Sequence, residues 1–140
     1  MPNFAKAALL ATLGLALGGC SGGLTDTTEL PAGVYALQTA NGQQLPLVID
    51  FIDSANQLEL LSGSVSIVAD GNFVDATTFR VTEAGAVSEV TEVASGQWSQ
   101  NRSTITLTPI DGSGAYTMTL SGGTRLTQNF PDLVLIYVKE

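Results

Sequence analysis

From Gly33 onward, closely spaced turn signals divide the chain into short segments, and this feature limits the folds open to it. Asn41-Gly42 and Asp70-Gly71 are dipeptides that favour tight hairpin turns. Between such turns, apolar and hydroxyl residues alternate, as in Thr104–Thr108, which is typical of a strand with one face on a core. The connections are too short for the crossovers that parallel strands need. We therefore expect an all-β chain of neighbouring antiparallel strands.

About eight to ten strands are expected from the spacing of these turns. Val87–Ala94 is the least regular, because its valines are three residues apart, but valine and threonine favour extended structure. Ser62-Gly63 marks either a bulge or a turn. The expected strands cover residues 33–39, 45–52, 58–61, 64–69, 73–82, 87–99, 104–108, 115–120, 125–128 and 133–138.

The number of strands also predicts how the sheet is closed. A flat sheet of this size would leave two unpaired edges, and closure into a barrel removes them. A two-sheet sandwich is the alternative, but it would need Greek-key crossovers that the short loops disfavour. We expect a single antiparallel up-and-down β-barrel over residues 33–140, with a β-sandwich as the alternative.

The first twenty residues carry a different signal. Lys6 is followed by an uncharged run, Ala7–Gly19, and then by Cys20, the single cysteine of the chain. This run is too short to cross a bilayer, which takes ~20 helical residues. A charged start, a short apolar run and small residues at its end are typical of a secretory signal peptide. We expect residues 1–19 to be a cleaved leader and residues 20–32, which are small and polar, to be a flexible tether.

Leu17-Gly18-Gly19-Cys20 resembles the lipobox of bacterial lipoproteins. The resemblance implies that Cys20 is the acylated first residue of the mature chain, with acyl chains such as palmitate that anchor it in the lipid bilayer. A plain signal peptide with Cys20 as a spare thiol is the alternative. Ser21, in place of the Asp that signals inner-membrane retention, favours the outer membrane, with the domain in the periplasm or on the cell surface.

Short motifs across residues 33–140, among them Gly33-Val-Tyr35 and Gly96-Gln-Trp98, resemble those of small bacterial lipocalin-like, or calycin-type, lipoproteins. The resemblance implies an up-and-down barrel that binds a small apolar ligand. Aromatic side chains are spread over most of the expected strands, and they either fill a solid core or line a pocket. The candidates for lining a pocket are Tyr35, Phe79, Tyr116 and Tyr137.

Composition excludes several classes of function. Five basic residues stand against 13 acidic ones, for a net charge of −8, which argues against binding to nucleic acid. The chain has no histidine, so it lacks an imidazole base or metal ligand. We expect no enzyme activity, no cofactor, no metal site and no catalytic residues. Glu59, Glu89 and Glu92 could be nominated for glycoside hydrolysis, but we expect most of the acidic residues to be solvated on the outer face.

Two functions from different classes remain. The first is a membrane-anchored lipoprotein whose barrel binds a small apolar ligand. The second is a non-catalytic structural or protein-interaction module of the cell envelope, with a solid barrel core and an acidic surface that suits a basic partner. In both, the partners are the bilayer, through Cys20, and either an apolar molecule or an envelope protein.

Overall fold

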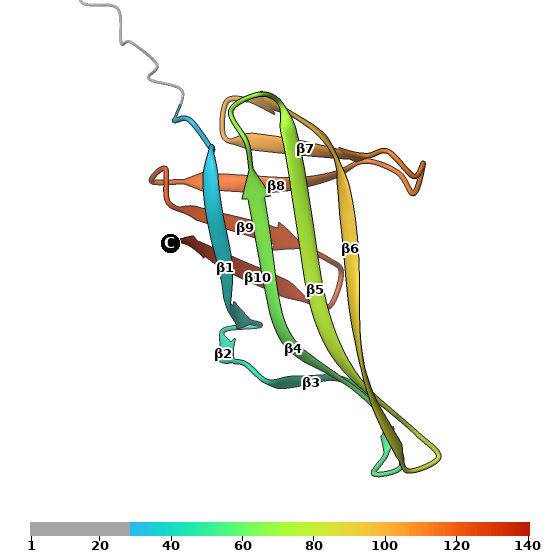
Figure 1. Cartoon of the computed structure of the whole chain (residues 1–140). Helices are drawn as coiled ribbons and strands as arrows, with labels where there is room; N and C mark the ends of the chain where they lie inside the picture. The colour runs from blue at the N-terminus through green and yellow to red at the C-terminus, as the bar shows by residue number, and fades with distance from the viewer. Residues whose placement is uncertain (1–28) are drawn as a thin grey trace, which may run out of the picture.

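The structure, a computed structural model, describes residues 29–140. The expected leader, Cys20 and the tether as far as residue 28 lie outside the described residues. Ten strands form one antiparallel sheet (Figure 1). They are β1 (Gly33–Ala40), β2 (Gln43–Gln44), β3 (Leu47–Asp53), β4 (Asn56–Ile67), β5 (Asn72–Glu83), β6 (Ala86–Asn101), β7 (Thr104–Pro109), β8 (Tyr116–Ser121), β9 (Arg125–Asn129) and β10 (Val134–Lys139).

The sheet closes on itself. β1 pairs with β10 on one side and with β4 on the other, so β1 and β4 to β10 form a closed eight-stranded barrel. Neighbouring strands follow one another in the sequence, except that β2 and β3 are inserted between β1 and β4. The predicted antiparallel up-and-down barrel is confirmed, and the single closed sheet excludes the two-sheet sandwich.

Two ambiguous segments of the sequence are resolved. Ser62-Gly63 follows a bulge and not a turn, because β4 runs unbroken from Asn56 to Ile67 while its register with β5 shifts between Leu60 and Ser62, which leaves Leu61 as the extra residue. Val87–Ala94 is a strand, the first half of β6, and it pairs with β5 residue by residue. Both segments are parts of strands longer than the sequence predicts, because pairing with β5 outweighs the local preference of glycine for a turn and the irregular spacing of the valines.

Alternate side chains point into the barrel and fill it. The hydroxyl of Tyr35 donates a hydrogen bond of 2.6 Å to the carbonyl oxygen of Pro31, so the polar end of this buried ring is satisfied. Burial raises the pKa of Tyr35 above its usual value, with a further contribution from Glu29. The buried apolar residues of this core are Tyr35, Leu37, Ala40, Leu60, Val65, Ile67, Phe73, Ile105, Leu107, Met118, Leu120, Leu126, Leu135 and Tyr137.

β4, β5 and β6 are the long strands of the molecule, and they run on beyond the barrel together with β3 (Figure 1). We call this part the extension; it consists of β3 and residues 56–60, 77–83 and 86–95. It carries apolar side chains that remain exposed to solvent. They are Val48, Phe51, Ile52, Val87, Val90 and Val93.

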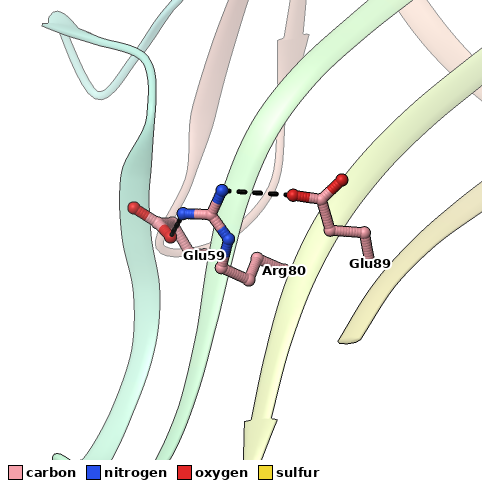
Figure 2. A network of polar contacts seen from close by, with 3 residues as sticks. All are labelled: Glu59, Arg80 and Glu89. Carbon is pink, nitrogen blue, oxygen red and sulfur yellow. Dashed lines mark hydrogen bonds and ion pairs between the residues drawn. The ribbon is translucent and has the colours of Figure 1, made fainter. Parts of the chain in front are cut away.

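The outer face of the extension carries a polar network. Arg80 of β5 lies between Glu59 of β4 and Glu89 of β6, with Nη1 2.9 Å from Glu59 Oε2 and Nη2 3.1 Å from Glu89 Oε1 (Figure 2). Next to it, the hydroxyls of Thr78 and Thr91 lie 2.9 Å apart. Ion pairs this close to solvent contribute little to stability, but the single positive charge of Arg80 links two carboxylates across three neighbouring strands and offsets one of their two negative charges.

Candidate functional site

A hollow of about 580 Å³ lies where β5 and β6 leave the barrel. We call it the mouth hollow. On one side it is lined by the inward-facing residues Asp75 and Ala94, which oppose each other in the β5–β6 register. Tyr116 of β8 and Gln128 of β9 line the other side, and the loop from Asp111 to Ala115 completes the wall together with Glu92, Val93 and Phe130.

Asp75 is the unusual group in the mouth hollow. Its Oδ2 accepts a hydrogen bond of 2.7 Å from the Tyr116 hydroxyl, whereas its buried Oδ1 has no hydrogen-bond partner among residues 29–140. Burial raises the pKa of Asp75, and the hydrogen bond from Tyr116 offsets part of that rise. Burial also raises the pKa of Tyr116, and the bonded Asp75 raises it further. The pair therefore keeps the Tyr116 hydroxyl protonated and its ring edge-on to Phe73, at a centroid distance of 6.3 Å.

An apolar groove continues from the mouth hollow along the inner face of the extension. It has a volume of about 310 Å³ and is lined by Ile49, Leu58, Phe79, Val81 and Val90, with Glu92 at one end. Glu92 also lines the mouth hollow, so the two spaces adjoin at this residue. The β4–β5 and β5–β6 registers place Leu58 opposite Val81 and Phe79 opposite Val90, which gives one continuous apolar surface.

The structure separates the four aromatic residues that the sequence nominated for a pocket. Phe79 lines the apolar groove and Tyr116 lines the mouth hollow. Tyr35 and Tyr137 are fully buried in the packed core. Residues 29–32, the end of the expected tether, contact the barrel: the backbone N–H of Gly123 donates to Glu29 Oε2 and the Gln100 side chain donates to the Glu29 carbonyl oxygen.

The carboxylates also divide between two faces. Glu59 and Glu89 are bound to Arg80 on the outer face, whereas Glu92 lies on the inner face with Asp75. Asp75 is not among the site residues predicted from the sequence, although the sequence contains a signal for it. Asp75 has the same parity as Phe73 and Phe79 in an alternating strand, which places a carboxylate on an apolar face.

This arrangement is suited to holding a molecule without covalent chemistry. The groove offers apolar contact, and the hollow offers a tyrosine hydroxyl, a buried glutamine and carboxylates. Among the residues that the structure describes, no lysine or arginine lines either space. Within residues 29–140, no group of three or more aspartate, glutamate, cysteine or histidine side chains is placed to hold a metal ion. No helix in that range is long and apolar enough to cross a membrane.

Comparison of the chain with models of known protein families, with curated proteins and with solved structures found no significant match.

Proposed function

We propose that this chain is a lipid-anchored lipoprotein of the bacterial cell envelope, of lipocalin-like type, and that it binds a small, mainly apolar molecule. The observation that carries the binding proposal is the junction of the apolar groove with the mouth hollow at Glu92. The ligand lies at the end of the barrel, because side chains such as Leu107 and Leu126 fill its interior.

The lining favours particular ligands. An alkyl chain packs against Leu58, Phe79 and Val90, and a neutral polar end reaches Tyr116 and Gln128. The carboxylates of Asp75, Glu92 and Asp111 line the hollow, and no lysine or arginine of residues 29–140 lines it with them, so a fatty acid is repelled where an alcohol of the same length is accepted. The proposed ligand is a neutral molecule with an apolar chain.

Photolabelling of the full chain in its membrane tests the ligand site. A photoreactive dodecanol should label peptides of β5 and β6, and unlabelled dodecanol should compete for this labelling better than dodecanoate. Phe79→Ser should reduce the labelling about tenfold, because the half-buried Phe79 ring lines the groove and its apolar contact with the ligand is part of the about 1.5–3 kcal/mol that full burial of a phenylalanine contributes.

Phe51→Ser is the matched control. It removes the same side chain from the same extension, but Phe51 is exposed and does not line the groove. Labelling should therefore stay at the level of the unmodified chain. Equal losses for the two variants, or labelling spread evenly over the barrel, would count against a site in the groove.

The anchor is tested separately at Cys20. Cys20→Ser should abolish incorporation of labelled palmitate and move the protein from the membrane to the soluble fraction, because the acyl chains provide the attachment. The neighbouring variant Ser21→Ala should keep both the label and the membrane location. Retention of Cys20→Ser in the membrane at the level of the unmodified chain would refute the lipobox assignment.

A further inference from the structure

Within the part of the chain that the structure describes, one edge of β6 has no partner strand over half its length. β6 pairs with β5 from Ala86 to Gln97, but with β7 only from Gly96 onward. The carbonyl oxygen of Ser95 accepts a hydrogen bond from Ile110 across this second edge. By alternation, the N–H and C=O groups of the odd-numbered residues from Val87 to Val93 point out of the same edge, and nothing in residues 29–140 pairs with them in the sheet. Such a row of groups is a template for another strand.

We propose that this edge pairs, in antiparallel orientation, with the same edge of a second copy of the chain, about a two-fold axis at Val90. In this register Val90 lies opposite its own copy. Val87 lies opposite Val93 of the second copy, and Glu89 lies opposite Thr91. Val90 and Glu92 also line the proposed ligand site, but the pairing is argued from the free backbone groups of β6 and needs no ligand.

The side chains of this stretch match their own antiparallel copy. Val87 and Val93 are each 63% exposed in the single chain, and the pairing covers them with each other on the outer face. On the inner face Ser88 meets Glu92, so a hydroxyl faces a carboxylate. A shift of the axis by one residue, to Glu89, would set two like charges opposite each other, which disfavours that register.

The other free edge of the extension, β3, is a poorer partner. Its register with β4 is interrupted twice, between Val48 and Asp50 and between Phe51 and Asp53, and such irregularities break the row of groups that a new strand needs. Pairing of β6 with β3 would also join different edges and generate open chains of molecules, whereas pairing of β6 with β6 closes at a dimer.

Cysteine cross-linking in the full chain, kept in its membrane, tests the pairing and its register. The odd-numbered residues form the hydrogen-bonded pairs, so Val90 and its copy form a non-hydrogen-bonded pair, whose Cα atoms lie about 4.5 Å apart. That distance suits a disulfide. With copper phenanthroline as the oxidant, Val90→Cys should give a species of twice the chain mass on a non-reducing gel.

Ser88→Cys is the matched control, because Ser88 is equally part of the exposed edge strand but lies opposite Glu92 and far from its own copy. We expect at least about tenfold less dimer from Ser88→Cys than from Val90→Cys, because a disulfide needs Cα atoms within about 7 Å. The unmodified chain, whose single cysteine is Cys20, sets the background. Adding Thr91→Pro to Val90→Cys should remove the dimer, since it deletes an outward N–H that β5 does not use.

Several results would overturn the proposal. They are the absence of a Val90→Cys dimer, equal dimer from Ser88→Cys, dimer that persists with Thr91→Pro, and a cross-linked product whose mass is not twice that of the chain. The last result would assign the edge to a strand of a different protein.

Discussion

Replacing Gly96 with alanine should destabilise the barrel by about 3 kcal/mol, the upper end of the range for overpacked sites. Gly96 is buried on β6 at the point where β7 joins it, opposite Pro109. A Cβ atom there would overlap the carbonyl oxygen of Thr108 and lie 2.9 Å from Pro109 Cα. Both obstacles are backbone atoms, which no side-chain rotation can move, so β6 and β7 would have to separate. Urea-induced unfolding of the two proteins measures the difference.

Gly63→Ala is the control for this prediction. Gly63 is also a strand residue facing the interior, but the atoms nearest to an added Cβ are Leu37 Cδ2 at 3.1 Å, Leu37 Cβ at 3.3 Å and Tyr137 Cε1 at 3.5 Å, all of them in side chains and all farther away than the two backbone atoms at Gly96. Side chains adjust by small rotations at lower cost than a backbone. Gly63→Ala should therefore lose clearly less stability than Gly96→Ala. Equal losses would mean that the β6–β7 contact is not the cause.

The barrel could be predicted from the sequence because the signals that define its strands lie within short stretches of the chain. Turn dipeptides such as Asn41-Gly42 set the strand limits, and the alternation in segments such as Thr104–Thr108 sets the inward face. The extension could not be predicted in this way. The alternation of apolar and polar residues predicts which way a side chain points. It does not predict whether a neighbouring strand still pairs with the strand at that position. That depends on the lengths of β6 and β7, which pair only from Gly96 onward.

For the same reason, the sequence could name aromatic residues of the candidate site but could not say which of them lie in it. The sequence offers Tyr35, Phe79, Tyr116 and Tyr137 as candidates for lining a pocket. Whether such a residue lies in the core or at the mouth depends on its depth along the barrel axis, which the strand register sets. Tyr137 is deep in the barrel, whereas Phe79 lies on the part of β5 that has left it.

Leu126→Ala should destabilise the protein by about 2–5 kcal/mol, as expected for a large core residue whose removal leaves a cavity. Leu126 of β9 is 0% exposed and belongs to the set of side chains that fills the barrel. Its neighbours are held by the closed sheet and collapse only partly into the space. The free energy of unfolding in urea measures the loss, and photolabelling by dodecanol measures the ligand site in the same variant.

Leu58→Ala provides the comparison that separates core from site. Leu58 is half-buried and lines the apolar groove, so the same truncation should cost less stability but weaken the photolabelling. Leu126→Ala should cost more stability than Leu58→Ala but leave the photolabelling of the folded protein unchanged. If the barrel interior were the ligand chamber, Leu126 would be a wall residue, and its truncation would enlarge the chamber, alter labelling and cost little stability. Opposite effects of the two variants would therefore place the ligand outside a solid core.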